Sequence, residues 1–452
     1  MAGTLSAGTR RFIRQGAFVA GAGLILGLAF GPLVGRAVGD AAHGGGHNAK
    51  FVALGKKFQG AESCAGAKCH TSGGSDRAPP KDSGGAGGNA NYNENLIWNK
   101  RDAHSKAFKT LQNDESKKIA SAMGIADATT AKECLSCHAV YIPPEQASLQ
   151  GENFKLSEGN SCNSCHGPSG DWNTPHQAKG WSDEQRKAMF KNPAAPTRAE
   201  HDALLAKTGF FDTRPILFRA EQCSSCHLAM DAKMVQAGHP QPKFELDYYT
   251  EGVPSDEKYP AWKHWRTDKG GLDVAKVWLV GQVVCARDAM LQLADRAANN
   301  VGDDMIKSAY EQAVAHGTML AVAMKSTGKG DFQGALDKVK AAKGNAAGLA
   351  TAAKEAAAAA DKMFETVDAV TLDKAGVAKL LADVAAVKGI VADAGADGHM
   401  QAYSAVYALT RGLTDNDKAA EVTDAIFFDP TSPMSADDFD KALAEVAGKL
   451  PK

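Results

Sequence analysis

The sequence predicts a mainly α-helical protein built from two unlike parts. Its 452 residues exceed the length of one typical domain and suit two or three. Residues 54–271 are rich in Gly, Pro, Asn and Ser and show weak hydrophobic periodicity. From residue 272 onward the chain is rich in alanine and carries apolar residues at helical spacing. We therefore expect a loop-rich domain over 54–271, followed by an antiparallel helical bundle over 272–452.

Composition and charge exclude several classes of protein. Hydrophobic residues make up 44% of the chain and charged residues 23%, which excludes a wholly disordered protein. No run after residue 40 is apolar for 18 residues or more, so the chain is not a multi-span membrane protein. The net charge of −1 gives no basic surplus and argues against binding to nucleic acid.

The first 39 residues have the layout of a secretory signal peptide. Arg10, Arg11 and Arg14 precede an apolar stretch from Ala17 to Val34, and small residues follow it. The alternative is an uncleaved anchor that associates the protein with a membrane. Residues 40–53 form a linker rich in Gly and His. Both interpretations predict a protein that works outside the cytoplasm, in the periplasm or after secretion, where thiols ordinarily become disulfides.

The C-terminal part contains a series of periodic apolar segments that predict helices. Val277, Val280, Val284 and Leu291 recur at helical spacing in the first of them. The expected helices are Asp273–Ala298, Asp303–Lys325, Phe332–Val367, Leu372–Ala392, Met400–Arg411 and Ala436–Lys449, the last of them capped by Ser435 with Asp438. Cys285 lies in the first helix and is expected to be a small buried apolar residue.

Eight of the nine cysteines fall into four pairs, and a histidine follows each pair at once. Three pairs have the spacing C-x-x-C-H: Cys134/Cys137/His138, Cys162/Cys165/His166 and Cys223/Cys226/His227. This pattern attaches c-type haem, because the two thiols form thioethers with the porphyrin and the histidine is the proximal ligand of the iron. Cys64 and Cys69, followed by His70, enclose four residues, and we interpret them as a longer-spaced variant. The sequence therefore predicts four covalently attached haem c groups.

Two other interpretations of the cysteine pairs are weaker. Cys134/Cys137 with Cys162/Cys165 is close to the spacing of a zinc knuckle, and disulfides are the usual outcome outside the cytoplasm. Neither requires a histidine after every pair. Four haem groups would also give the loop-rich part the apolar surface that it needs in order to fold.

Three further histidines lie in distinctive segments. They are His104 in Ile97-Trp98…Ala103-His104-Ser105-Lys106-Ala107, His176 in Cys165-His166-Gly167-Pro168…Trp172…Pro175-His176, and His239 in Ala237-Gly238-His239-Pro240…Phe244-Glu245-Leu246. In their order around the four motifs, over about residues 54–266, these segments resemble the tetrahaem cytochrome c554 family. The extra residues in the first motif and the long insertion before His104 depart from the family pattern.

The resemblance implies that His104, His176 and His239 are distal haem ligands. It also implies that the haem of the second motif, on His138, lacks a protein ligand on one face. His201 and His264 are the remaining candidates for a fourth distal ligand. We expect His201 to face solvent and His264 to be structural. His316 and His399, in the haem-free part, are expected to have surface or packing roles.

The function that the sequence predicts is electron transfer between redox partners outside the cytoplasm. By resemblance to the c554 family, the donor would be a larger multihaem oxidoreductase, such as a hydroxylamine-oxidising enzyme, and the acceptor another cytochrome or a membrane quinone reductase. One alternative is a redox enzyme that acts on a small nitrogen species at a five-coordinate haem. Another is a subunit of an extracellular haem filament, which would make the chain part of an oligomer. The C-terminal part resembles a haem-free remnant of larger multihaem proteins or a docking domain.

Overall fold

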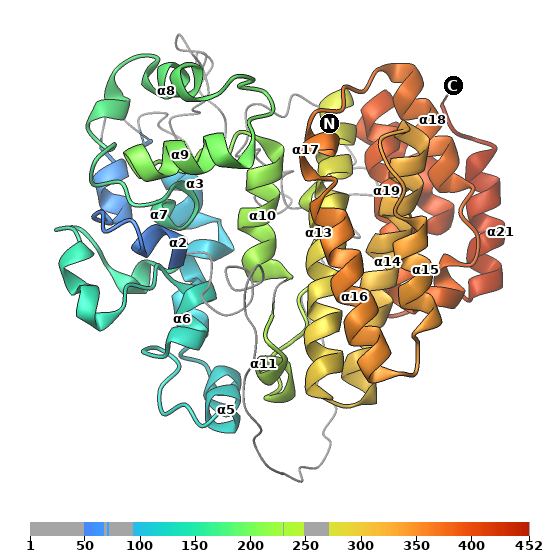
Figure 1. Ribbon diagram of the computed structural model, residues 1–452, viewed down its shortest axis with the longest axis horizontal. Coiled ribbons are helices and arrows are strands. Elements are labelled where there is room, and N and C mark those ends of the chain that lie inside the picture. Colours follow the sequence, from blue (N-terminus) through green and yellow to red (C-terminus); the bar gives the residue numbers. More distant parts are fainter. Residues whose placement is uncertain (1–48, 67–69, 72–93, 229, 248–270, 452) are drawn as a thin grey trace, which may run out of the picture.

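The computed structural model describes residues 49–66, 70–71, 94–228, 230–247 and 271–451. Within these residues the chain is helical, and the only β feature is an isolated bridge between Phe58 and Gln150. The predicted mainly α fold is therefore confirmed. Figure 1 shows two parts side by side, with α2–α11 in one and α13–α21 in the other. The predicted signal and linker up to residue 48, together with Cys69 and His264, lie outside the described residues.

The N-terminal part consists of short helices joined by long loops. Its α-helices are α2 (Ala49–Val52), α3 (Glu94–Lys100), α4 (Ala107–Thr110), α5 (Asp114–Ala122), α6 (Lys132–His138), α7 (Cys162–His166), α8 (Trp181–Met189), α9 (Arg198–Thr208), α10 (Ile216–His227) and α11 (Ala232–Gln236). Single 3-10 turns are η2 (Ala61–Cys64), η3 (Ala103–Lys106), η4 (Pro144–Leu149), η5 (Leu156–Glu158) and η6 (Pro175–Gln177). Three of the helices end at the histidine of a cysteine motif, so the motifs are presented at helix ends.

The C-terminal part is a bundle of longer helices. They are α13 (Leu272–Asn299), α14 (Asp303–Thr327), α15 (Gln333–Ala341), α16 (Ala346–Asp361), α17 (Phe364–Asp368), α18 (Lys374–Ala385), α19 (Ile390–Leu413), α20 (Asn416–Thr423) and α21 (Ala436–Ala447), with the turn η7 (Asp424–Ile426) before α21. Helix α13 packs against α14, α16 and α19. Alanines on α16 such as Ala353 and Ala356 are fully buried, and their small side chains let the helices approach closely.

The predicted helix positions are correct where apolar periodicity is unbroken and wrong where a glycine interrupts it. The expected helix Phe332–Val367 is three helices, and Gly344, with φ of +84°, lies between α15 and α16. Helix α18 ends before Gly389, and α19 begins well before the predicted start at Met400. The N-cap of α21 is confirmed, since Ser435 accepts a hydrogen bond from the backbone of Asp438. Helix α20 was not expected.

One hydrophobic core continues from the N-terminal part into the bundle. Phe211 and Phe218 belong to the same buried cluster as Trp278 and Cys285 of α13, and Cys285 is fully buried as predicted. Helix α10 packs directly on α13 and lies between the two parts in Figure 1. The two parts therefore share buried apolar surface.

Ion pairs cross the same seam between the parts. Glu221 of α10 accepts from Arg198 of α9 at 2.8 Å and from Arg287 of α13 at 2.6 Å. Burial opposes ionisation of Glu221, but the two arginines outweigh it and lower the pKa of its carboxyl to about 2. The ionised carboxylate therefore connects three helices.

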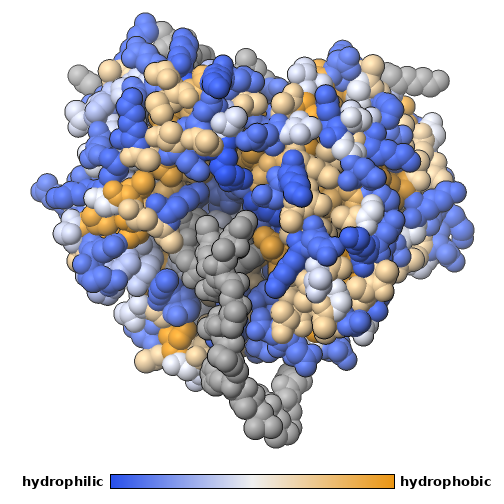
Figure 2. Space-filling model, viewed as in Figure 1, coloured by the Kyte–Doolittle hydropathy of each residue, from blue (hydrophilic) through white to orange (hydrophobic). Residues whose placement is uncertain are grey.

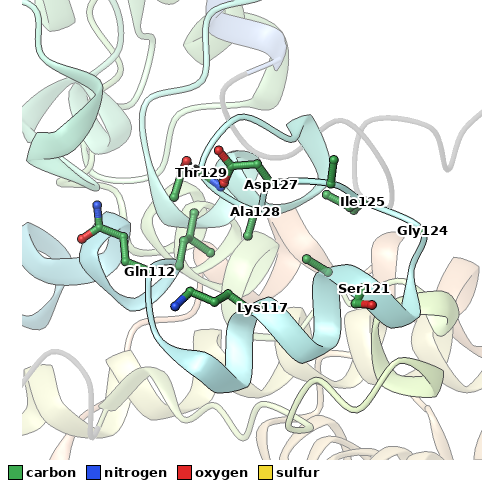
Figure 3. Close-up of a pocket in the computed structure, with 11 residues that line it drawn as sticks. Gln112, Lys117, Ser121, Gly124, Ile125, Asp127, Ala128 and Thr129 are labelled. Atoms are coloured by element: carbon green, nitrogen blue, oxygen red, sulfur yellow. Dashed lines mark hydrogen bonds between the residues drawn. The ribbon is translucent and has the colours of Figure 1, made fainter.

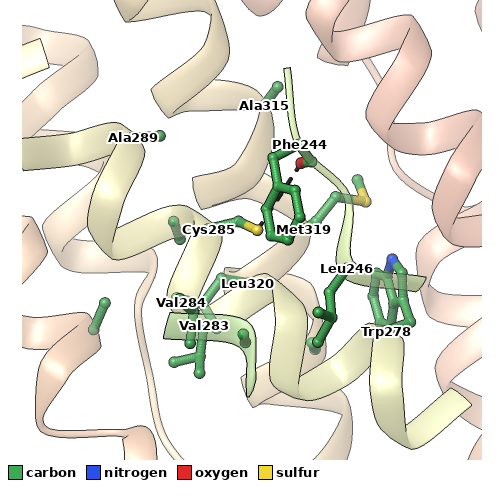
Figure 4. Packing of buried hydrophobic residues seen from close by; sticks show 14 of the residues in the cluster. Phe244, Leu246, Trp278, Val283, Val284, Cys285, Ala289, Ala315, Met319 and Leu320 are labelled. Carbon is green, nitrogen blue, oxygen red and sulfur yellow. Dashed lines mark hydrogen bonds between the residues drawn. The ribbon is translucent and has the colours of Figure 1, made fainter. Parts of the chain in front are cut away.

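The segment that follows α11 lies within the bundle. Phe244 and Leu246 insert among side chains of α13 and α14 such as Cys285 and Met319 (Figure 4). A Cβ at Gly281 would lie only 2.9 Å from Leu246 Cβ, so a glycine in mid-helix makes room for the segment. On either side, Lys243 Nζ lies 2.5 Å from Asp397 Oδ1, and Arg411 donates to Asp247 at 3.3 Å. We call residues 243–247 the inserted segment.

The outer surface gives no sign of a membrane-spanning element in the described residues. None of their helices combines the length and the apolar character that crossing a bilayer requires. The face shown in Figure 2 is mostly hydrophilic over both parts, and hydrophobic residues are scattered on it.

Candidate haem centres

The cysteines and histidine of each described motif share one helix face. In α6, α7 and α10 the three residues stand at positions i, i+3 and i+4, which point to the same side of a helix. The first motif differs, because Cys64 closes the turn η2 and His70 follows after the longer spacing. The described cysteines of the motifs are free thiols and half-buried. They can therefore form thioethers beside the histidine that follows them.

Thiols of different motifs lie next to one another. Cys64 is in hydrogen-bond contact with Cys162, and Cys137 is in hydrogen-bond contact with Cys226. Cys165 and Cys223 are close enough to interact electrostatically. The contacts arrange the motifs in the spatial order first, third, fourth, second.

These contacts argue against the zinc interpretation of the cysteines. The zinc alternative would gather Cys134, Cys137, Cys162 and Cys165 at one point, but Cys162 lies beside Cys64 and Cys137 beside Cys226. Among the described residues there is no group of three or more His, Cys, Asp or Glu side chains able to hold a bare metal ion. The described cysteines also form no disulfide with one another.

Three pairs of histidine rings lie next to each other, and each pair joins a motif histidine to a predicted distal one. The ring centroids lie 6.3 Å apart for His70 and His176, 5.9 Å for His227 and His104, and 6.4 Å for His138 and His239. A histidine nitrogen binds a metal at about 2 Å, and the ring centre lies roughly 1.1 Å behind it, so two imidazoles on opposite sides of one metal have centres about 6 Å apart. The pairs therefore have the spacing that an iron between two axial histidines requires, and these residues fit a haem group.

The hydrogen bonds of five predicted ligands leave the same ring nitrogen available. Nδ1 of each lies within 3.0 Å of an oxygen: His70 of Glu94 Oε2, His104 of Asp102 Oδ1, His138 of Ala107 O, His176 of Asn173 O and His239 of Pro240 O. An Nδ1–H that donates to such an oxygen fixes the tautomer and directs Nε2 toward the metal. The oxygen acceptors Glu94 and Asp102 were not predicted, although Asp102 stands only two residues before His104.

The acidity of these histidines suits metal binding, which requires a neutral imidazole. Burial lowers the pKa of His138 and His176, and burial together with the nearby His104 lowers the pKa of His227 to about 4. For His70 and His104 burial also acts to lower the pKa, but the hydrogen bonds and charges of Glu94 and Asp102 raise it overall. The two carboxylates make the imidazoles of His70 and His104 more basic and therefore stronger ligands for a metal.

Histidines outside the predicted ligand set use Nε2 for structural contacts. His201 is fully buried, lies 2.9 Å from Asp212 O through Nε2, and stacks on Phe218 with ring centroids 3.9 Å apart. The expectation that His201 faces solvent is therefore wrong, because its ring completes the core between α9 and α10. His399 Nε2 lies 3.0 Å from Ile426 O, and His316 lies in a polar cluster described below. Both are fully buried, so theirs are packing roles and not surface roles.

At the second motif the ring of His239 lies next to that of His138, with centroids 6.4 Å apart and an angle of 63° between the planes. His239 would therefore be a candidate second ligand at the centre for which the resemblance implies an open face. At the third motif the aromatic ring of Phe210 lies parallel to the ring of His166, with centroids 6.3 Å apart. Trp172 and Trp181 pack edge-on against Phe210.

The pocket in Figure 3 lies next to the second motif. It has a volume of about 730 Å³ and is formed by α5 and the loop that follows it, with residues such as Gln112, Lys117, Ser121 and Asp127 in its lining. Its lining also includes Leu111, Ala120 and Ala128, which belong to the buried cluster against which Cys134 packs.

The comparisons with known proteins agree with this geometry. Residues 91–167 match the family model described as cytochrome c554 and c-prime. The matched stretch includes His104 and the complete second and third motifs. No curated protein and no solved structure matches the chain. Over residues 91–167 the chain is thus similar to the cytochrome c554 family, which supports a c-type cytochrome with covalently bound haem c and a role in electron transport.

Proposed function

We propose that the chain is an extracytoplasmic tetrahaem cytochrome c that passes electrons between redox proteins. The observation that carries the proposal is the three histidine pairs, each of which joins a motif histidine to a distant one at ring separations of 5.9–6.4 Å. Haem c, when bound, supplies a one-electron iron couple. The signal-like residues 1–39 support an extracytoplasmic site of action.

The residues of the chain have three tasks in this function. The cysteines tether each group covalently, which prevents its loss outside the cell. The paired histidines complete the coordination of iron in both oxidation states, so that little rearranges when an electron arrives or leaves. Glu94 and Asp102 orient His70 and His104 and increase their basicity, which favours the oxidised state at those two centres.

The spatial order of the motifs supports a defined route for electrons. The thiol contacts join the first motif to the third, the third to the fourth and the fourth to the second. Electrons would therefore pass between neighbouring centres in this order. Suitable partners are other cytochromes or a multihaem oxidoreductase that dock at the two ends.

The haem count tests this proposal directly. Intact-mass measurement of the purified protein should give the mass of the chain plus four haem groups, because all four cysteine pairs precede a histidine. The same sample should be reduced and reoxidised reversibly in an optical titration. Four haem groups with no reversible redox change would contradict electron transfer, and three haem groups with Cys64 and Cys69 unmodified would contradict the interpretation of the first motif.

A further inference from the structure

A buried carboxyl group lies in a polar cluster inside the haem-free bundle. Glu245, in the inserted segment, is 7% exposed, and its carboxylate oxygens accept from Gln282 Nε2 at 3.1 and 3.2 Å. His316 Nδ1 lies 3.7 Å from Glu245 Oε1, and Gln401 Nε2 lies 3.4 Å from His316 Nε2. The cluster thus joins the inserted segment to α13, α14 and α19 through a carboxyl group and uncharged partners.

The imidazole of His316 does not neutralise this carboxyl group. It is fully buried, and burial together with the nearby Lys243 lowers its pKa to about 3, so the ring is neutral at physiological pH. The charged side chains around the cluster are engaged in pairs of their own, Lys243 with Asp397 and Arg411 with Asp247. The thiol of Cys285, also nearby, is kept protonated, since burial raises its pKa well above the usual range.

The balance of these surroundings favours a proton on Glu245 near neutral pH. Burial is the largest cause and the negative charge of Asp247 adds to it, while the hydrogen bonds from Gln282 and Gln401 act in the opposite direction. Together they raise the pKa of Glu245 to about 8. A small change in local charge is then enough to add or remove this proton at physiological pH.

The cluster adjoins one of the candidate haem centres. Phe244, the residue before Glu245, stacks its ring on that of His227, with centroids 5.7 Å apart and an angle of 21° between the planes. Figure 4 shows Phe244 held among Cys285, Met319 and Ala315 of the bundle. The buried ring of Phe244 thus connects His227 of the fourth motif to the backbone of Glu245.

We propose that Glu245 is a proton-binding site coupled to reduction of the centre at His227. The inference rests on the proposed electron-transfer function. If haem c is held at His227, one electron from a donor redox protein would remove one positive charge beside the cluster. Above the pKa of Glu245, where the group is a carboxylate before the electron arrives, it would then take one proton from solvent and become a carboxylic acid, so that electron and proton arrive together. In this proposal the role of the haem-free bundle is to shield the carboxyl group of Glu245 from water.

Potentiometric titration of the holoprotein across the pKa range of Glu245 tests the coupling. In the unaltered protein one midpoint potential should fall as pH rises, with a slope that approaches about 59 mV per pH unit, the value for one proton per electron. Glu245→Gln keeps the shape of the side chain and should abolish that slope. Asp368→Asn is the matched control, since it removes another buried carboxyl group whose pKa burial raises, against the opposing effects of Lys276 and the backbone of Leu217, and should leave the slope intact.

A spectroscopic readout keeps the inference testable if Glu245→Gln fails to fold. The infrared difference spectrum of the unaltered protein, reduced minus oxidised, should contain the band of a newly protonated carboxylic acid. Absence of that band, or an unchanged slope in folded Glu245→Gln, would overturn the inference. Failure of the proposed function itself would look different, because the unaltered protein would then show no reversible midpoint potential at any pH.

Discussion

At the scale of single residues, the choice of ring nitrogen separates two kinds of histidine. His138 and His239 each place Nδ1 near a backbone oxygen and lie next to one another, whereas His201 uses Nε2 for a structural contact with Asp212 O. A histidine whose Nε2 is already engaged inside the core is a poor candidate for an iron ligand. The same residue type therefore has two roles, which hydrogen bonding distinguishes and composition does not.

This distinction predicts opposite results for two substitutions. His239→Ala should leave the iron at the second motif with one axial protein ligand and increase the high-spin ferric signal over that of the unaltered protein by about one haem in four. His201→Ala should produce no such increase, although loss of its stacking on Phe218 should lower stability by about 2 kcal/mol. Electron paramagnetic resonance of the oxidised variants measures the first effect and thermal unfolding the second. An increase in the high-spin signal from His201→Ala alone would reverse the assignment.

At the scale of elements, helix α10 connects the attachment site of the fourth motif to the bundle. The motif occupies its last turn, and Glu221, just before the motif, pairs with Arg198 and Arg287 on the two neighbouring helices. Removing the charge of this nearly buried carboxylate would leave the half-exposed Arg198 and the nearly buried Arg287 next to each other without it. The position of the motif thus depends on an ion-pair network that spans both parts of the chain.

The network predicts a loss of stability in acid. The pKa of Glu221 is about 2 in the folded protein and its ordinary value is 4.5, so the stabilisation is fully present above about pH 4.5 and is lost as pH falls toward 2. The shift corresponds to roughly 3 kcal/mol. Glu221→Gln should lower the free energy of unfolding at neutral pH and flatten its dependence between these pH values, as followed by circular dichroism. If the free energy of unfolding of the variant still falls between pH 4.5 and 2 as it does in the unaltered protein, other carboxyl groups dominate the loss of stability in acid.

The elements also show what sequence can and cannot predict. Helices α13 and α14 were predicted within a few residues, because their apolar periodicity continues to their ends. The break at Gly344 and the early start of α19 were missed, since alanine-rich sequence remains helical in pattern on both sides of a turn. The motif histidines were named from the cysteine patterns, and the three distal candidates were implied by the resemblance to the c554 family. Their pairing was not, because His70 and His176 meet only through the tertiary fold.

At the scale of the whole molecule, the bundle and the loop-rich part are joined through buried surface. The inserted segment lies before the sequence-based boundary near residue 271, yet Phe244 and Leu246 pack inside the bundle. Composition placed the boundary where alanine-rich helices begin and could not identify a short segment before it that packs inside the bundle. The bundle therefore holds the chain just after His239, a predicted ligand, as well as filling its own core.

We expect the haem-free bundle to fold alone as a colourless helical domain when it keeps the inserted segment. A fragment of residues 243–452 keeps the inserted segment, whereas a fragment of residues 272–452 loses Phe244 and Leu246, which are 1% and 0% exposed. Emptying two such core positions costs on the order of 5 kcal/mol, which is comparable to the whole stability of a small domain. The longer fragment should therefore melt cooperatively and the shorter one at a much lower temperature or without a transition, as measured by circular dichroism. Phe244→Ala with Leu246→Ala in the longer fragment should reproduce the behaviour of the shorter one, because the loss comes from these two side chains. Equal melting temperatures for the two fragments would mean that the inserted segment does not contribute to the stability of the bundle.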